Sequence, residues 1–252
     1  MDINELISTA KQAAIKAGEA IIEIYESGDF SIEAKSDDSP LTRADKASHN
    51  VIVSFLEKTN LPILSEEGST VPFEERKNWD YFWMIDPLDG TKEFIKKNGE
   101  FTVNIALIHR DEVVAGVVYT AVLKDLYWAI IGEGAFKDGK KLNVNSFSRE
   151  DKALKVVASR SHLNDETQSF LAELNQPEIV SKGSSLKLLM VAEGQADLYP
   201  RYAPTMEWDT AAAQIIVEEA GGTVVQKDSD RKVVYNKENL LNPYFLVSGK
   251  VR

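Results

Sequence analysis

Apolar residues recur every three or four positions over residues 2–26, which predicts an amphipathic helix at the start of the chain. Gly28 follows and is typical of a helix end. The repeated apolar positions are Leu6, Ala10, Ala13, Ala17, Ile21 and Ile24. A second helix is expected from about Thr42, with Asp45 three residues later. Its expected inward positions are Ala44, Ala47, Val51 and Phe55.

The next part of the chain is rich in strand-forming residues. Residues 62–65 predict a short strand that ends in Glu66 and Glu67. Residues 81–85 predict a buried strand that ends at Asp86, because Pro87 lacks an N–H for the ladder. Three further β-rich runs cover residues 101–109, 113–120 and 126–131. The first half therefore predicts two helices beside a largely antiparallel sheet.

The second half alternates short strands with helices, which indicates an α/β layer arrangement. The expected strands lie at 154–158, 178–180 and 197–199, and the expected helices lie at 165–174, from Ser184, and from Asp209 to 221. The fold class is therefore α/β, with an α+β first half. We expect two subdomains, residues 1–145 and 146–252, that share one cleft. The first would carry most of the metal ligands.

Composition narrows the class of function. The 252 residues carry a formal net charge of −11, which argues against binding to nucleic-acid polymers or anionic membranes. The absence of cysteine excludes disulfides and thiolate catalysis. Charged residues interrupt residues 1–25, so no signal peptide is expected. No apolar run is long enough for an integral membrane segment. A cytoplasmic location is the default prediction.

The segment D-P-L-D-G-T at residues 86–91 carries the strongest chemical signal. Asp86 and Asp89 place two carboxylates at the end of a predicted core strand, where they repel each other unless a cation lies between them. Gly90 permits a tight turn, and Thr91 is expected to cap a short helix beginning with Lys92. A helix N-terminus there suits a phosphate. An ordinary Asx turn explains the same residues equally well at this point.

Other acidic residues also lie at the ends of predicted elements. Glu66 and Glu67 directly follow an apolar strand, where unpaired carboxylates are costly to bury. Asp209 is alternatively an ordinary helix cap, and Asp45 alternatively a favourable charge in a first helical turn. Carboxylate oxygens suit Mg²⁺, and a chain with three histidines and no cysteine disfavours zinc. Two such ions could clamp the attacking and leaving oxygens of a phosphoryl transfer.

The second half offers parts for binding a phosphate. Ser184 lies where a helix is expected to begin, and Lys187 lies one turn into that helix. Arg201 follows a predicted strand. Each has a simpler explanation, since Ser184 suits a routine cap and the two cations suit the surface. The segment at 159–162 also ends a strand and contains His162, a loop histidine that contacts the substrate or is merely solvated.

Three motifs now stand in order along the chain: S-E-E at 65–67, D-P-L-D-G-T at 86–91, and E-W-D-T-A-A-A at 207–213 followed by E-A-G-G. This series resembles the inositol monophosphatase superfamily of magnesium-dependent, lithium-sensitive phosphatases. Residues 86–108 are similar to its bacterial 3′(2′),5′-bisphosphate nucleotidase branch, as is the stretch at 37–45. The resemblance covers nearly the whole chain and implies a layered α-β-α-β-α sandwich.

The resemblance also implies roles for individual residues. Two or three Mg²⁺ ions would be held by Glu67, Asp86, the Leu88 carbonyl, Asp89 and Asp209. Thr91, Asp45 and Glu66 would act near the attacking water as the catalytic residues. Substrate contacts would come from Glu67, Asp89, Gly90, Thr91, Lys92, Ser184, Lys187, Arg201 and Asp209. Inositol-specific members use a glutamate shortly before the W-D motif to contact the sugar, and Glu207 lies nearby but out of register.

The function implied is a phosphomonoester hydrolase that removes the 3′-phosphate from adenosine 3′,5′-bisphosphate, a by-product of sulfate assimilation, giving AMP and phosphate. An inositol monophosphatase and a sugar bisphosphatase are the alternatives within the same chemistry. A non-catalytic protein that binds metal and phosphate is the alternative from another class, but it would need no water-orienting Thr91. The expected partner is a small phosphorylated molecule, with a nucleotide favoured. The resemblance also admits a homodimer.

Overall fold

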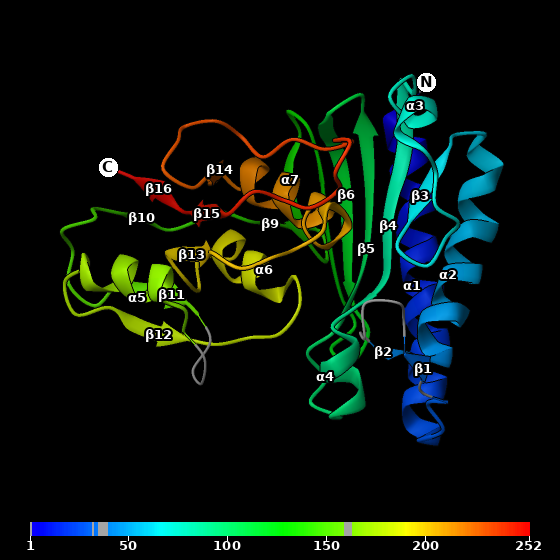
Figure 1. The fold of residues 1–252 in the computed structure, drawn as a ribbon, viewed down its shortest axis with the longest axis horizontal. Coiled ribbons are helices and arrows are strands. Elements are labelled where there is room, and N and C mark those ends of the chain that lie inside the picture. The colour runs from blue at the N-terminus through cyan, green and yellow to red at the C-terminus, as the bar shows by residue number, and fades with distance from the viewer. Residues whose placement is uncertain (1, 32, 35–39, 159–162) are drawn as a thin grey trace.

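The computed structural model describes residues 2–31, 33–34, 40–158 and 163–252. They form five layers: a helix pair, a seven-stranded sheet, a second helix pair, a five-stranded sheet and a last helix (Figure 1). The predicted α-β-α-β-α sandwich is therefore confirmed. Among the described residues, no helix combines the length and apolar character needed to cross a membrane.

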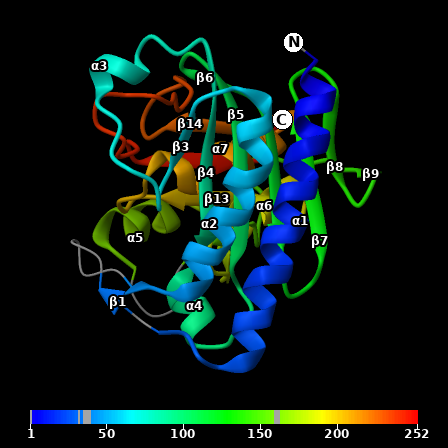
Figure 2. The ribbon, with the colours of Figure 1, turned by 90° about the vertical axis from the view of Figure 1, so that its right-hand side faces the viewer.

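The first layer pairs α1 (Ile3–Ser27) with α2 (Arg43–Leu56), and Figure 2 shows them side by side in front of the large sheet. Gly28 ends α1 with a positive φ of 75°. Thr42 caps α2 and forms a reciprocal capping box with Asp45, as the spacing predicts. Of the predicted inward positions of α2, Ala44 is buried, but Ala47, Val51 and Phe55 each lie one residue before a buried position. The buried residues of α2 are Ala44, Asp45, Ser48, Ile52 and Leu56.

The large sheet has the strand order β3-β4-β5-β6-β7-β8-β9. Only β3 and β4 run parallel, and every later neighbour pairs antiparallel. The apolar runs of the sequence give strands because both faces of this sheet are covered by helices. The strands are β3 (Ile63–Ser65), β4 (Tyr81–Asp89), β5 (Thr102–His109), β6 (Glu112–Thr120), β7 (Asp125–Ile130), β8 (Gly134–Lys137) and β9 (Lys140–Lys141).

The strand β4 does not stop at Asp86, so that expectation was wrong. It continues to Asp89, which pairs with Thr102 of β5 across an irregularity that lies between Asp86 and Asp89. Pro87 is tolerated there because the pairing of β3 with β4 ends at Ile85 and the ladder is already interrupted. The irregularity therefore lies between the two aspartates of the motif.

The middle layer consists of α6 (Leu186–Ala192) and α7 (Ala211–Glu219), which belong to the second half of the sequence. The helix α7 lies directly on the large sheet opposite α1 (Figure 1). Gly116 of β6 makes this close approach feasible. A Cβ atom at Gly116 would lie 2.5 Å from the carbonyl oxygen of Ala212 and 2.9 Å from its Cα. The absence of a side chain at Gly116 therefore allows α7 to pack this closely on the sheet. Asp209 lies just before the start of α7.

The smaller sheet has the order β12-β11-β13-β15-β14, and α5 (Asp165–Ala172) packs against it as the outermost layer. Its strands are β11 (Lys155–Val157), β12 (Glu178–Val180), β13 (Leu198–Arg201), β14 (Thr223–Gln226) and β15 (Phe245–Ser248). The remaining elements are short. They are β1 (Glu33–Ala34), β2 (Pro40–Leu41), η1 (Glu57–Thr59), α3 (Phe73–Arg76), α4 (Thr91–Ile95), β10 (Ser146–Phe147), η2 (Glu207–Asp209) and β16 (Lys250–Val251).

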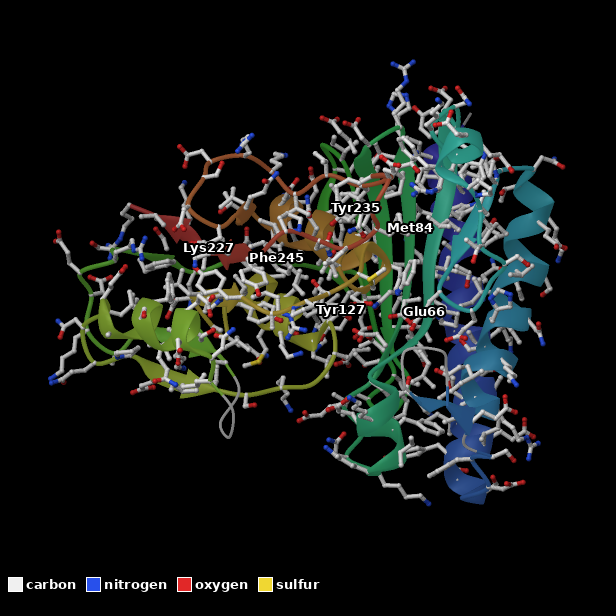
Figure 3. All side chains as sticks on the ribbon, in the orientation of Figure 1. Glu66, Met84, Tyr127, Lys227, Tyr235 and Phe245 are labelled. Carbon is white, nitrogen blue, oxygen red and sulfur yellow. The ribbon has the colours of Figure 1, made fainter. Side chains whose placement is uncertain are left out.

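The division at residues 145 and 146 stays a prediction. The two sheets fall on either side of it, but α7 shares one buried cluster with the large sheet, including Met84 of β4 and Ile216 of α7. Figure 3 shows Met84, Tyr127 and Tyr235 within the region where the two halves meet. Any site between the sheets is therefore built on a continuous apolar core.

Gly116→Ala should destabilise the protein by roughly 1–3 kcal/mol, because the new methyl group would overlap the backbone of α7. Urea denaturation followed by circular dichroism would measure the loss. Gly139→Ala is the control, since no atom lies within 4 Å of its added Cβ and only the strain of its positive φ, about 1 kcal/mol, is expected. An unchanged urea midpoint for Gly116→Ala would contradict the close approach.

Candidate active site

The site begins where two neighbouring strands end. Because β3 and β4 run parallel with Ser65 beside Ile85, the next residues, Glu66 and Asp86, lie at the same edge of the sheet. The N–H of Glu66 donates to the Ile85 carbonyl at 3.2 Å (Glu66 is labelled in Figure 3). Acidic residues far apart in the sequence are thus brought together by strand register.

Asp86 is the most deeply buried of these acids, with 1% of its surface exposed. Its Oδ1 accepts a hydrogen bond from the Leu88 N–H at 3.1 Å. Burial raises the pKa of Asp86 well above its ordinary value, and the nearby Glu66, Asp89 and Asp209 raise it further. A hydrogen bond with the Glu66 carboxyl shifts the pKa of Asp86 in the same direction.

Asp89 connects the two halves of the molecule. Its Oδ2 accepts from the backbone N–H of Ser185, at the start of α6, at 2.5 Å, and from Asn104 of β5 at 3.5 Å. Burial raises the pKa of Asp89, while the positive charge of Lys187 and the Ser185 N–H oppose the rise. The second half of the chain therefore supplies both a donor and a cation to an aspartate of the first half.

Asp209 reaches the same place from η2, the turn before α7. Its Oδ2 accepts from the Met206 N–H at 2.9 Å. Burial and the charge of Asp89 raise the pKa of Asp209 to about 7, and Arg201 lowers it in part. The mutual pKa effects of Asp86, Asp89 and Asp209 show that these acids form one electrostatic cluster.

Thr91 does not cap α4, so that expectation was wrong. The cap is Gly90, with a positive φ of 96°, and Thr91 is the first helical residue. This frees its hydroxyl group, which donates to Oδ1 of Asp45 at 3.1 Å and approaches the Leu88 carbonyl at 3.4 Å. Asp45 is 1% exposed, and its pKa is raised by burial and by the charge of Glu67. Thr91 and Asp45 therefore form a pair beside the cluster.

Glu67 is the second residue after the end of β3 and is half-buried. Its N–H donates to the Ser65 hydroxyl at 3.2 Å, and the same hydroxyl lies 2.9 Å from Nδ1 of His49. Burial lowers the pKa of His49, and the charge of Glu67 opposes this shift. His49 and Ser65 thus set the direction in which Glu67 leaves the strand.

A pocket of about 570 Å³ opens beside this cluster, between the first helical turns of α4 and α6 and the strand β13. Asp89, Gly90 and Asp209 line one part of it, while Ser184, Lys187 and Arg201 line another. Among the described residues, the buried Oγ of Ser184 and Nε of Arg201 have no hydrogen-bond partner. The pocket is therefore lined by cations on one side and by acids on the other, and two of its lining residues carry buried polar atoms without a partner.

Three predicted substrate contacts, Glu67, Thr91 and Lys92, are not among the residues that line the pocket. Glu67 and Thr91 belong to or lie beside the acidic cluster instead, which leaves Lys92. The side chain of Lys92 is exposed. The next helical turn instead presents Lys96 there, and Lys182 contributes a further cation. The predicted segment 159–162, which includes His162, lies outside the described residues.

Residues that hold Asp89 in place were missed from the sequence. The hydroxyl of Ser185 donates to Oδ1 of Asn104 at 3.0 Å and lies 2.7 Å from the Thr102 hydroxyl. Thr102 and Asn104 are buried polar residues inside an otherwise apolar strand. That interruption of the apolar run was the signal that could have identified them, because a buried amide needs a partner.

The acidic set has the chemistry of a magnesium site. Among the described residues, no three His, Asp or Glu side chains are already grouped closely enough to hold an ion. Asp86, Asp89 and Asp209 each turn one oxygen to a backbone N–H, and the Glu66 carboxyl raises the pKa of Asp86. Buried, mutually repelling carboxyl groups nevertheless favour a hard divalent cation, which would offset their repulsion and draw the other oxygens inward.

Comparison with known proteins gives a consistent result. Residues 2–246 match the model of the inositol monophosphatase family. The chain is 45% identical over 240 residues to the 3′(2′),5′-bisphosphate nucleotidase CysQ of Salmonella typhimurium, covering 94% of this chain and 97% of that one. It is 43% identical to the CysQ of Escherichia coli K12, with the same coverage.

Solved structures resemble the fold over nearly its full length. CysQ from Bacteroides thetaiotaomicron, described as a bacterial member of the inositol monophosphatase family, has a TM-score of 0.85 and 45% identity, and 96% of each chain is covered. The inositol monophosphatase TM1415 of Thermotoga maritima has a TM-score of 0.79 and 26% identity, covering 97% of this chain and 92% of that one.

Magnesium should stabilise the protein more strongly as the pH rises. The raised pKa values mean that the folded acids bind protons more tightly than the unfolded ones. Tighter proton binding by the folded acids adds to the free energy of unfolding. This addition is complete at low pH and is lost as the pH rises from about 4 to about 7. Protons compete with a metal ion for the same oxygens. The rise in Tm with added magnesium should therefore grow between about pH 5 and about pH 7.5.

Differential scanning fluorimetry with and without magnesium, after chelation, would measure this shift. Asp86→Asn is the control, because the amide keeps the shape of the side chain but removes its charge. It should unfold at a higher temperature than the wild type without magnesium and respond weakly to magnesium. A magnesium shift that is equal at all pH values, or equal in Asp86→Asn, would argue against a metal site at the cluster.

Proposed function

The chain belongs to the inositol monophosphatase family, and we propose that it removes the 3′-phosphate from adenosine 3′,5′-bisphosphate, giving AMP and phosphate. It is a phosphatase that acts on bisphosphate nucleotides, as its relatives of 43–45% identity are named. One observation carries the finer proposal. A cluster of buried acids and a pair of cations, Lys187 and Arg201, face the same pocket.

The pocket has two charged regions that suit two phosphate groups. The phosphate to be cleaved would lie against the acidic cluster through bound cations, near the Gly90 and Thr91 backbone. The second phosphate would lie against Lys187 and Arg201, where the partnerless Nε of Arg201 offers a further donor. A monophosphate would leave Nε of Arg201 unpaired and the two cations without an anion, which disfavours it as a substrate.

Magnesium is the metal that the donor set favours. Glu67, Asp86, the Leu88 carbonyl, Asp89 and Asp209 would hold two or three ions. When bound, Mg²⁺ supplies charge that activates a water and neutralises the transferring phosphoryl group. The backbone N–H groups of Leu88 and Ser185 already hold one oxygen of Asp86 and one of Asp89, so an ion would draw in the other oxygen of each.

Thr91 and Asp45 would orient the attacking water. The Thr91 hydroxyl donates to Asp45, which leaves its oxygen lone pairs directed away from that bond and able to accept a proton from water. The raised pKa of Asp45 makes this carboxyl a suitable proton acceptor beside it. Glu66 contributes a second carboxyl at the same strand edge. The water would attack phosphorus in line, without a covalent intermediate on the enzyme.

Other expectations stay predictions from the resemblance. They are a cytoplasmic location, a homodimer and inhibition by lithium. Removal of a by-product of sulfate assimilation fits the family. None of these bears on how the pocket distinguishes one phosphate ester from another.

A substrate panel tests the proposed activity. The value of kcat/KM for adenosine 3′,5′-bisphosphate should exceed that for inositol 1-phosphate by at least about 100-fold, because only a bisphosphate matches both charged regions. Fructose 1,6-bisphosphate, which also carries two phosphates, tests whether the spacing of the two groups matters. Phosphate release in the presence of magnesium would be measured for each compound. Asp86→Asn should abolish release while its circular dichroism spectrum stays native. A preference for inositol 1-phosphate would overturn the nucleotide assignment, and full turnover by Asp86→Asn would overturn the metal assignment.

Thr91→Val should lower kcat by roughly 100-fold or more, because it removes the hydroxyl that links the water to Asp45 while keeping the shape of the side chain. Thr91→Ser keeps the hydroxyl and serves as the matched control, with kcat within about tenfold of the wild type. Steady-state kinetics at saturating magnesium would separate the two. Equal kcat values for the Val and Ser variants would remove Thr91 from the mechanism.

A further inference from the structure

Glu207 is a fully buried carboxylate that the proposed reaction does not use. None of its surface is exposed, although it lies only two residues before Asp209. Its Oε2 accepts from the Asn236 N–H at 2.6 Å, and its Oε1 accepts from the Lys237 N–H at 3.1 Å and from Lys237 Nζ at 2.5 Å. Each of these donors belongs to one short segment near the end of the chain.

The direction of this side chain separates it from the substrate. Asp209 and Thr210 line the pocket, but Glu207 does not. Three donors, one of them charged, already occupy the carboxylate oxygens of Glu207, so a sugar hydroxyl would have to displace a buried ion pair. The proximity of Glu207 to Asp209 in the sequence therefore does not make it a substrate contact.

Residues 236–242, which we call the strap, hold the turn η2 along its whole length. The Glu207 N–H donates to the Leu240 carbonyl at 2.9 Å. The Asn242 side chain donates to the Met206 carbonyl at 2.8 Å and to the Thr210 hydroxyl at 2.9 Å. The strap thus contacts the residues on both sides of Asp209.

The strap is fixed in turn to the first half of the molecule by Arg76 at the end of α3. Arg76 is 2% exposed, and it donates to Oδ1 of Asn236 and to the Glu238 carbonyl, both at 2.9 Å. The Asn236 amide donates back to the Arg76 carbonyl at 2.9 Å. The same half of the chain carries Asp86 and Asp89, so this link sets where η2 meets them.

We propose that Glu207 is a positioning residue that, through the strap and Arg76, fixes Asp209 beside Asp89 and thereby sets the affinity of the site for magnesium. This inference rests on the proposed function, since it assumes that Asp209 is a metal ligand. Its physical basis is repulsion. Asp89 and Asp209 repel each other before an ion arrives, and an unanchored turn would move Asp209 away. A buried ion pair with multiple hydrogen bonds resists that movement better than an exposed contact does.

Glu207→Gln tests the proposal in the full chain, because the amide keeps the size of the side chain but weakens its hold on Lys237 and the strap. Titration calorimetry with Mg²⁺ alone should show a dissociation constant about 10-fold higher or more, as for other residues that orient metal ligands. At saturating magnesium, KM for adenosine 3′,5′-bisphosphate should stay within about twofold, and excess magnesium should restore most of kcat.

Glu193→Gln is the matched control. Glu193 also accepts a partly buried hydrogen bond, from Tyr127 at 2.5 Å, and pairs with Lys137 at 3.5 Å, but it lies at the far end of α6. It should lower the urea midpoint without changing the magnesium dissociation constant. Comparing the two variants separates the positioning of Asp209 from a general loss of stability.

Asn236→Gly is a second variant that tests the proposal if Glu207→Gln does not fold. Glycine suits the positive φ of 56° at this position, while the contacts of the side chain with Arg76 are lost. It should raise the magnesium dissociation constant in the same direction. Unchanged magnesium binding in the folded variant, or a raised KM at saturating magnesium, would overturn the proposal. A wild type that binds magnesium but does not hydrolyse the nucleotide would overturn the proposed function alone, because calorimetry does not depend on the substrate.

Discussion

The repulsion between buried carboxyl groups is the constraint on which the rest of the site depends. Strand register places Glu66 beside Asp86, and the turn before α7 adds Asp209 at the same edge. Such groups can be buried only when each is held by donors and when a proton or a cation lies between them. The backbone N–H groups at Leu88, Ser185 and Met206 supply the first condition. The second is the reason for proposing that the cluster binds a divalent ion.

This constraint also explains why the two halves of the molecule are joined so closely at the pocket. Asp89 belongs to the first half, but its donor from Ser185 and its compensating charge on Lys187 belong to the second. Asp209 belongs to the second half, but the strap that holds its turn is fixed to Arg76 of the first. Each half therefore supplies acids that the other half keeps in place, and neither contains a complete site.

Much of this arrangement could be predicted from the sequence, and the remainder depends on packing. Local signals sufficed for the end of α1 at Gly28 and for the alternation of strands and helices in the second half, because helix caps and apolar periodicity act over a few residues. The five-layer arrangement was implied by the resemblance of the motif series to a known family. Local signals failed at Pro87, since a proline stops a strand only where a partner strand is present to be lost. Asn104 interrupts an apolar run, which signals a buried partner but does not identify it as Ser185, 81 residues away. The partners of the Glu207 carboxylate also lie far along the chain, 29 and 30 residues away. Composition does not encode such distant contacts.

The contact between Arg76 and Asn236 spans 160 residues, which affects how the enzyme folds during its synthesis. During synthesis the large sheet and most acids emerge from the ribosome well before the strap, and domains generally fold as they emerge. The nascent chain would then hold an assembled but incomplete acidic edge until residues 236–242 arrive. Catalytic competence is thereby tied to completion of nearly the entire polypeptide, and a product truncated before the strap would be an inert fragment.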